Sequence, residues 1–244
     1  MRRSPRVIPS SLSTWLASMF WSGPTAGSSK CDWIPRNPEK ATALSCVKSS
    51  LNPPLDVPTL TLVAGPNGSG KSSLSASLTF ENSSRIIDPD AIARTLDPDR
   101  PDRAAISAAR AAVTGSKDLL RRRESFILET TLAGNGALAR LREAKLAGYR
   151  TLLVYLALRT AELHIERVRL RVSQGGHDVP DVDIRRRYER SLIHAPEAMR
   201  LADEAVVFDN SGTGPERMLT VASGRITWRA RTLPAWVLDL AARL

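Results

Sequence analysis

The segment from Gly65 to Ser73 carries the clearest chemical pattern in the chain. Its sequence, Gly-Pro-Asn-Gly-Ser-Gly-Lys-Ser-Ser, matches G-x-x-x-x-G-K-[ST] at every fixed position. Glycines let the backbone turn its N–H groups toward an anion, and a following helix adds the positive end of its dipole. In such a phosphate-binding loop (P-loop) the lysine bridges the β- and γ-phosphates and the serine hydroxyl binds Mg²⁺. The pattern predicts a nucleoside triphosphate site in which Ser72 is the Mg²⁺ ligand. The residues that form this site are Gly65, Pro66, Asn67, Gly68, Ser69, Gly70, Lys71, Ser72 and Ser73.

Two aspartates follow the second predicted strand, residues 84–88. Asp90 lies just past that strand, where a kinase needs a carboxylate that orients the acceptor hydroxyl and accepts its proton. The alternative is that Asp88 or Asp90 caps the short helix that begins at Ala91. Spacing alone leaves both interpretations open.

Glu129 ends the apolar run Phe126–Leu128, which predicts a buried strand beside the P-loop strand. A carboxylate in that place can hold Mg²⁺ through water or bind a sugar hydroxyl. A helix cap by Thr130 or Thr131 is the alternative. The functional interpretation is favoured, because a charged residue at the end of a buried strand adds little to solubility.

Arg167 and Arg171 lie four residues apart, so they share one face of a predicted helix. Two guanidinium groups on one face can clamp a phosphoryl group during its transfer. The alternative is a solvated face on which Glu162 and Glu166 pair with the arginines. Gly175-Gly176-His177 follows, and the paired glycines predict a hinged lid over the nucleotide.

Strand and helix patterns alternate along the chain and must position these residues. Strands are predicted at 60–64, 84–88, 126–129, 151–158 and 205–208, with helices between them and a hairpin at 218–227. This order predicts an α/β fold of the P-loop NTPase type, a doubly wound and mostly parallel sheet with a helical lid. The phosphate site then lies at the carboxyl ends of the strands. We assign residues 57–244 to this kinase domain and residues 1–56, rich in Ser and Pro, to a disordered extension.

Composition narrows the classes of partner. The net charge is +10, of which residues 1–56 supply +4, and aromatic residues make up only 5% of the chain. No basic run interleaved with aromatics was identified, which argues against nucleic acid. No apolar run approaches the length of a membrane span. The two cysteines fit a reducing cytosol, so we expect a cytoplasmic protein.

Residues 205–209, Ala-Val-Val-Phe-Asp, look like the Mg²⁺-binding strand of transporter-type ATPases. Those enzymes place a glutamate after the aspartate, whereas Asn210 follows here. Their signature glycines also open a helix, while Gly175 and Gly176 close one. The chain is therefore not expected to be a transporter-type ATPase.

In their combined order, these motifs resemble the zeta-toxin family of P-loop kinases. The shared parts are Gly65–Ser72, Asp88-Pro-Asp90-Ala-Ile-Ala, Glu129-Thr-Thr-Leu, the Arg167 to Pro180 segment with its Gly-Gly-His, and Asp209-Asn-Ser. The resemblance implies ATP- and Mg²⁺-dependent phosphorylation of UDP-N-acetylglucosamine on a sugar hydroxyl, with an antitoxin protein as a possible partner. It implies that Lys71 and Ser72 hold ATP, that Asp90 is the base, that Arg167 and Arg171 act on phosphate, and that substrate contacts come from Asp88, Glu129, Thr130 and His177.

Two alternatives belong to other functional classes. One is a kinase for another hydroxylated small molecule, such as an antibiotic or a nucleotide. The other is a protein that uses ATP hydrolysis for binding or remodelling and has no small acceptor. Asp90 and the predicted lid favour a kinase.

Overall fold

The structure is a computed structural model that describes residues 57–77 and 85–244. The predicted extension, residues 1–56, lies outside the described residues. The strands of the described part are β1 (Thr59–Ala64), β2 (Arg85–Ile87), β3 (Phe126–Thr130), β4 (Arg150–Ala157), β5 (Glu204–Asp209), β6 (Glu216–Ala222) and β7 (Arg225–Arg229). Its helices are α3 (Lys71–Ser77), α4 (Pro89–Leu96), α5 (Pro101–Arg122), α6 (Gly136–Leu146), α7 (Ala161–Ser173), α8 (Asp181–Leu201) and α9 (Ala235–Ala241).

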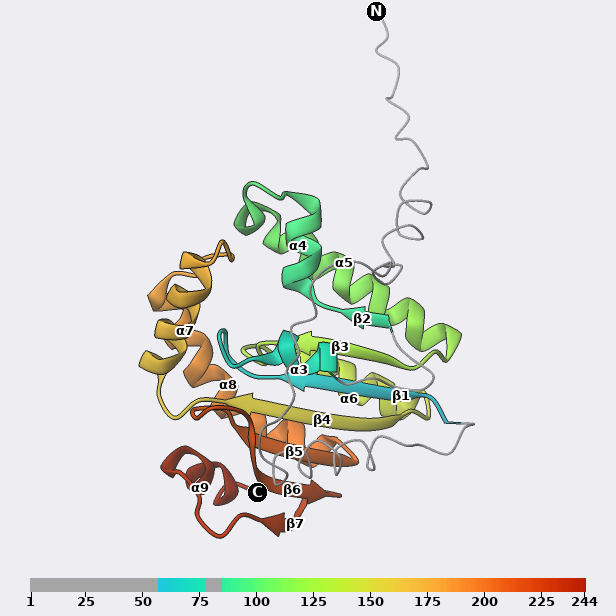
Figure 1. Ribbon diagram of the computed structural model, residues 1–244. Coiled ribbons are helices and arrows are strands. Elements are labelled where there is room, and N and C mark those ends of the chain that lie inside the picture. Colours follow the sequence, from blue (N-terminus) through green and yellow to red (C-terminus); the bar gives the residue numbers. More distant parts are fainter. Residues whose placement is uncertain (1–56, 78–84) are drawn as a thin grey trace, which may run out of the picture. The chain divides into compact units, whose positions relative to one another are not determined.

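The strands of residues 57–77 and 85–244 form one seven-stranded sheet in the order β2-β3-β1-β4-β5-β6-β7 (Figure 1). The neighbours from β2 to β5 pair in parallel, and β6 and β7 add an antiparallel hairpin at one edge. The mostly parallel α/β sheet and the terminal hairpin expected from the sequence are both confirmed.

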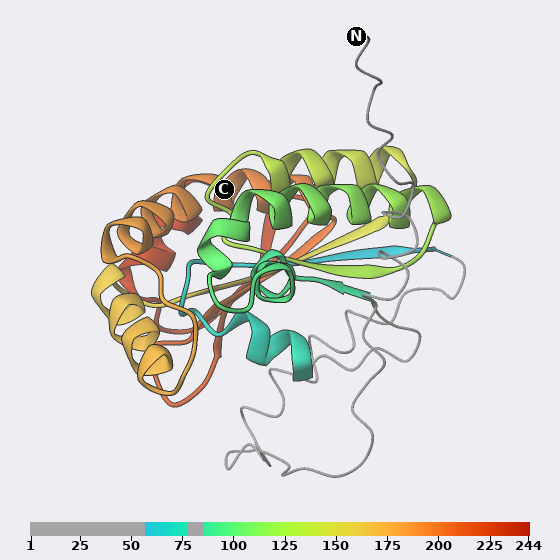
Figure 2. The ribbon, with the colours of Figure 1, turned by 90° about the horizontal axis from the view of Figure 1, so that it is seen from above.

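Helices cover the two faces of this sheet unequally. Helices α5, α6, α8 and α9 lie together on one face, and α3 lies on the other (Figure 2). The larger apolar cluster joins the four helices to β1 through Leu60 and Leu62, whereas the second cluster joins Val63 to Leu74 of α3. Every residue of β1 is buried, as expected for a central parallel strand. The P-loop therefore starts from a fixed position.

The carboxyl ends of the parallel strands bring the predicted site residues to one edge. Val63 lies opposite Glu129 in the β1–β3 pair, and Ile87 of β2 lies opposite Leu128. The P-loop follows β1 and Asp88 follows β2, so both emerge beside Glu129. Helix α7 lies beyond this same edge (Figure 1).

Helix α8 extends further than its sequence indicates. The sequence predicts a helix that Pro180 opens and that runs to about His194. Helix α8 instead continues to Leu201, although Pro196 within it cannot donate a backbone hydrogen bond. Ala195, Ala198 and Met199 are completely buried in the larger apolar cluster. Their burial outweighs the missing hydrogen bond.

None of the helices in the described part of the chain is long and apolar enough to cross a membrane.

Candidate active site

The P-loop connects β1 to α3 and packs closely against the surrounding elements. Gly65, Gly68 and Gly70 all adopt positive φ angles, of 148°, 76° and 97°. A Cβ atom on Gly68 would lie 2.8 Å from the His164 carbonyl oxygen and 3.3 Å from Val168 Cγ2. Glycine is needed there because the loop lies directly on helix α7.

Side chains from distant parts of the chain form hydrogen bonds with residues of the P-loop. His164 Nδ1 lies 2.7 Å from the Asn67 carbonyl oxygen, and Asn210 Nδ2 donates to the Ser69 carbonyl oxygen at 2.8 Å. Arg187 Nη1 donates to Asn67 Oδ1 at 3.1 Å. Because the N–H and C=O of a peptide group point in opposite directions, anchored carbonyls favour N–H groups turned toward a bound anion.

His164 is completely buried, and its hydrogen bonds fix its tautomer. Its Nε2 atom accepts from the Leu158 backbone N–H at 3.0 Å, so the proton sits on Nδ1 and is donated to Asn67. Burial lowers the pKa of His164 to about 4, and the charges of Lys71 and Arg167 add to the shift. The imidazole is therefore a neutral link between the end of β4, helix α7 and the P-loop.

Lys71 lies among carboxylates. Burial lowers the pKa of its ammonium group, and Glu129, Asp90 and Asp88 oppose that shift, Glu129 most strongly. Its Nζ atom donates to the Pro66 carbonyl oxygen at 3.0 Å. The three carboxylates and the lysine therefore interact electrostatically beside the P-loop.

Glu129 is buried at the end of β3 with 4% of its surface exposed. Ser72 Oγ donates to its Oε2 atom at 3.0 Å. Burial raises the pKa of Glu129, and the negative charge of Asp88 raises it further. A hydroxyl and a carboxylate beside the P-loop are hard oxygen donors of the kind that Mg²⁺ takes. Among the described residues no cluster of three or more His, Cys, Asp or Glu side chains is arranged to hold a metal alone.

The structure separates the roles of Asp88 and Asp90, which the sequence left open. Asp88 caps α4, because its Oδ1 atom accepts from the Asp90 backbone N–H at 2.9 Å. Asp90 is exposed in the first turn of the helix, so its carboxylate is not the cap. Burial raises the pKa of Asp88, and the charge of Asp90 adds to this.

The helix cap by Thr130 or Thr131, the less favoured alternative, is not found. The next helix, α6, begins at Gly136 with Asn135 at the capping position. Thr130 Oγ1 instead accepts from the Leu132 backbone N–H at 3.0 Å. Leu132 is completely buried at φ 54°, an uncommon conformation for a residue other than glycine. The loop after β3 is thus held in a strained, specific shape next to Glu129.

Arg167 and Arg171 do not form the surface ion pairs offered as the alternative. Glu162 pairs with Arg185 of α8 instead. Arg167 Nη2 donates to the Asn210 carbonyl oxygen at 2.5 Å, and Arg171 Nη2 donates to the His177 carbonyl oxygen at 2.6 Å. Arg171 Nε is buried without a hydrogen-bond partner among the described residues.

The glycines after α7 close that helix, as the sequence predicts. Gly175 has φ 86°, and its N–H donates to the Val172 carbonyl oxygen at 2.9 Å. The following loop carries His177 and leads into α8, so α7 and α8 form a helical pair beside the P-loop. The predicted movement of this pair as a lid stays a prediction.

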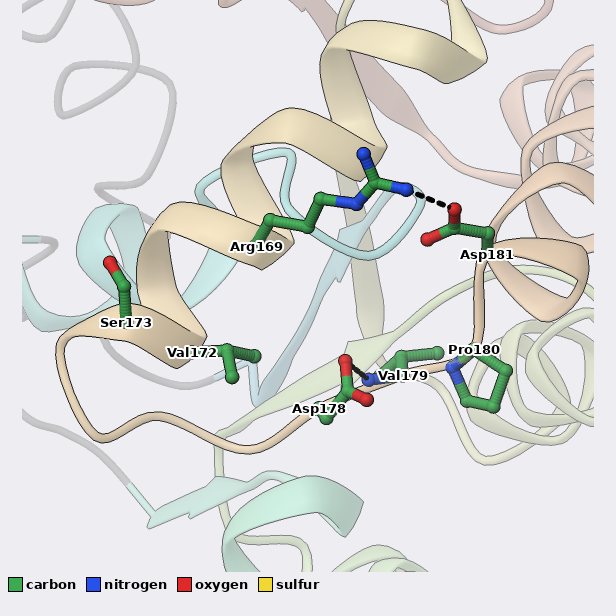
Figure 3. A pocket seen from close by; sticks show the side chains of 7 residues that line it. All are labelled: Arg169, Val172, Ser173, Asp178, Val179, Pro180 and Asp181. Carbon is green, nitrogen blue, oxygen red and sulfur yellow. Dashed lines mark hydrogen bonds and ion pairs between the residues drawn. The ribbon is translucent and has the colours of Figure 1, made fainter.

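A pocket of about 430 Å³ is lined by residues of α7, of the loop after it and of the start of α8, and none of these residues belongs to the P-loop (Figure 3). Arg169 crosses it to meet Asp181 at 2.5 Å, while Ser173 and Asp178 lie at its other end. Arg169 thus points away from the partners of Arg167 and Arg171, as its place in the helix predicts.

Comparison with known proteins identifies the family of the chain. Residues 60–191, more than half of the chain, match the family described as AAA domain (AAA_33). The chain belongs to this family. An uncharacterised protein of Haemophilus influenzae is 34% identical to it over 124 residues, which are 51% of this chain and 88% of that protein.

Solved structures share the architecture of this AAA-domain chain. The crystal structure of AvrRxo1-ORF1:AvrRxo1-ORF2 with sulphate ions is 15% identical, with a TM-score of 0.62, and the match covers 92% of this chain and 80% of that one. A second structure of that complex, with ATP, is 14% identical with a TM-score of 0.61, over 91% and 80% of the two chains. At these identities the likeness is one of fold, and the chain has an α/β fold of the P-loop NTPase type.

The sequence did not predict the P-loop contacts of three residues. His164, Arg187 and the side chain of Asn210 contact P-loop residues that are 97, 120 and 141 positions away in the chain. The one signal for His164 was its place between Leu163 and Ile165, in a helix that must pack on the sheet. Asn210 lies beyond the residues that match the family, which end at Ser191.

Proposed function

We propose that this protein is an ATP-dependent kinase that phosphorylates a hydroxyl group of a nucleotide sugar, UDP-N-acetylglucosamine, in the manner of zeta-type toxins. The observation that carries the proposal is the position of Asp90. It is exposed in the first turn of α4, where Asp88 is the cap, and its charge opposes the lowering of the Lys71 pKa. A kinase needs such an uncommitted carboxylate at the phosphate site, whereas a simple ATPase needs none for an acceptor alcohol.

Nucleotide binding rests on the P-loop and its supports. Lys71 is the candidate for the β- and γ-phosphates, and it can exchange its contact with Pro66 for them. The ATP-bound structure of AvrRxo1-ORF1:AvrRxo1-ORF2, which has the same fold, supports ATP as the nucleotide.

Ser72 and Glu129 fit a Mg²⁺ ion that also binds phosphate oxygens, since Mg²⁺ usually takes one or two carboxylates together with its substrate. When bound, the ion would neutralise charge that develops on the phosphates. In this assignment Glu129 serves the metal first, and any contact with the acceptor is secondary.

Transfer itself requires a base and a positive charge at the phosphoryl group. Asp90 accepts the proton of the acceptor hydroxyl as its oxygen attacks the γ-phosphorus, and the bond to the β–γ bridging oxygen breaks. Arg171 has a buried Nε–H without a hydrogen-bond partner in the described part of the chain, and its charge lowers the pKa of Lys71. It is therefore our candidate for stabilising the transferred group. His177 and Thr130 are assigned to the substrates on the family resemblance.

The acceptor and the biological role follow from that same resemblance. Depletion of UDP-N-acetylglucosamine would make the protein toxic in the cytoplasm, where ATP and nucleotide sugars are made. A neutralising protein partner is part of the proposal. The AvrRxo1 structures contain two proteins, ORF1 and ORF2, which supports a fold of this type acting within a complex.

The test is incubation of the purified protein with ATP, Mg²⁺ and single nucleotide sugars, with products read by mass spectrometry. We expect a mass increase of one phosphate on UDP-N-acetylglucosamine and equal release of ADP. Lys71→Ala is the negative control, and it should lose about 3 kcal/mol of transition-state stabilisation. Phosphorylation of another hydroxyl compound would keep the kinase and change the acceptor. ADP release that no acceptor stimulates would favour an ATPase.

A further inference from the structure

The loop after β5 contacts the P-loop through Asn210, and the proposed function gives it no role. Three of its polar groups form hydrogen bonds. Its N–H donates to the Ala157 carbonyl oxygen at 3.0 Å, its Nδ2 donates to the Ser69 carbonyl oxygen at 2.8 Å, and its own carbonyl oxygen accepts from Arg167 at 2.5 Å. Asn210 therefore joins β4, the P-loop and α7 at one point.

Further contacts keep this loop in place. Asp209 is buried, and its Oδ1 atom accepts from the Ser211 backbone N–H at 2.8 Å. Arg159, at the end of β4, pairs with Asp209 Oδ2 at 3.2 Å and donates its backbone N–H to Ser211 Oγ at 2.9 Å. These contacts fix the loop that carries Asn210, and so fix the position of its side chain at the P-loop.

The fit between Asn210 and the P-loop is close. A Cβ atom on Gly70 would lie 2.6 Å from Asn210 Nδ2, so the amide occupies the space that any other residue at position 70 would need. Ser69 is completely buried, and among the described residues its carbonyl oxygen would be left without a partner if the amide were removed. An unpaired buried carbonyl is costly, so the loop would shift to regain a hydrogen bond.

We infer that Arg167 is a positioning residue that acts through Asn210 on Ser69, so that helix α7 sets the shape of the P-loop for nucleotide binding. The guanidinium group of Arg167 donates to the carbonyl oxygens of Asn210 and Gly212, and so fixes the orientation of the Asn210 peptide and side chain. A movement of α7 is then transmitted to the phosphate site along one chain of hydrogen bonds.

Arg167 and Arg171, which the sequence assigned to the same function, thus have different roles. The charge of Arg171 acts on Lys71, whereas that of Arg167 acts on His164, and the described hydrogen bonds of Arg167 go to the β5 loop. Arg171 remains a candidate for the phosphoryl group. The inference rests on ATP binding within the proposed function and not on the identity of the acceptor.

The test is a double-mutant cycle on ATP affinity, measured with a fluorescent ATP analogue and no acceptor. Arg167→Met and Asn210→Ala should each weaken binding by about tenfold, the size expected for one hydrogen bond to a charged or buried group. The double variant should be no weaker than either single one, because both act on the same chain of contacts. Arg169→Met, on the same helix but paired with Asp181, is the matched control and should bind as the original protein does.

Two results would overturn the inference. Losses that multiply to about a hundredfold in the double variant would mean that Arg167 and Asn210 act independently, as a direct contact of Arg167 with phosphate would require. Unchanged affinity in Arg167→Met would mean that α7 does not set the loop. Thermal melting is measured for each variant, and Arg167→Lys with Asn210→Ser replaces any variant that does not fold. Failure of the original protein to bind the analogue would refute the proposed function itself.

Discussion

Ser72 Oγ donates a hydrogen bond to Glu129 Oε2 at 3.0 Å, which joins two residues that are 57 positions apart in the chain. The contact follows from the register of the sheet, because Val63 at the end of the P-loop strand lies opposite Glu129. It places a hydroxyl and a buried carboxylate at the first turn of α3. This pair is the part of the site that best fits a divalent cation.

Substitution Glu129→Gln tests that pair. The amide keeps the shape of the side chain but lacks the negative charge that a metal ion requires. We expect the Mg²⁺ dependence of ATP turnover to shift to concentrations about 10- to 100-fold higher. Burial and Asp88 both raise the pKa of Glu129, so loss of its charge should not lower the melting temperature. A fall in stability with unchanged Mg²⁺ dependence would instead make the residue structural.

The glycines of the chain offer a matched pair of substitutions. Gly68→Ala puts a Cβ atom 2.8 Å from the His164 carbonyl oxygen at a φ of 76°. Such strain costs about 1–3 kcal/mol, so ATP affinity should fall by about tenfold or more as the loop shifts away from α7. Calorimetric titration with ATP measures this, and near-normal affinity would show that the loop has room to adapt.

Gly136→Ala is the control in an open position. No heavy atom of residues 57–77 and 85–244 lies within 4 Å of a Cβ placed there, and the residue begins α6. Alanine restricts the unfolded chain more than glycine does, so the free energy of unfolding should rise by about 0.4–1 kcal/mol. ATP affinity should not change.

The sequence allowed most of the fold to be predicted because its signals are local. The runs 60–64, 126–128, 151–157 and 205–208, which became β1, β3, β4 and β5, contain no charged residue. The P-loop was recognisable because its chemistry depends on adjacent residues. The length of α8 was not predictable in this way, since the burial of Ala198 and Met199 by distant elements decides it.

The supports of the P-loop could not be predicted for the same reason. The contact of His164 with Asn67, like that of Asn210 with Ser69, is set by sheet order and by the packing of α7. His164 belongs to no periodic or spaced motif, and the Asp209-Asn-Ser motif that holds Asn210 does not indicate which residue its side chain contacts. The choice between Asp88 and Asp90 as the cap of α4 depended on side-chain geometry that spacing does not contain.

His164 predicts a specific dependence of stability on pH. Its pKa is about 4 in the folded protein and near 6.5 in the unfolded chain, so the unfolded state binds more protons between those values. Stability is therefore full above pH 6.5 and falls as the pH drops toward 4, by about 3 kcal/mol in all. His164→Gln has no titrating group and should show a flatter unfolding profile over this range. His177→Gln, a histidine outside the core, should retain the original profile, and parallel profiles for all three proteins would contradict the assignment.

The remaining prediction concerns the base. Asp90→Asn keeps the size of the side chain but cannot take a proton, and a positioned base contributes about 10²- to 10⁴-fold. Phosphoryl transfer should fall by that range, measured as ADP released in the presence of the acceptor. ATP affinity should barely change, because Lys71 and the P-loop hold the phosphates. The melting temperature should also stay the same, since Asp90 is exposed and is not the cap.

Variants of Asp88 are the controls that test whether Asp90 is the base. Asp88→Asn retains a side-chain oxygen for the Asp90 N–H and should preserve both the cap and most of the activity. Asp88→Ala removes the cap and should cost about 1 kcal/mol of stability, with a smaller loss of turnover than Asp90→Asn. If Asp90→Asn transfers phosphate normally while Asp88→Asn does not, the proton passes to Asp88. Its pKa is already raised by burial and by its neighbour, which would suit that role. Equal transfer in both asparagine variants would leave Glu129 as the remaining carboxylate at the site.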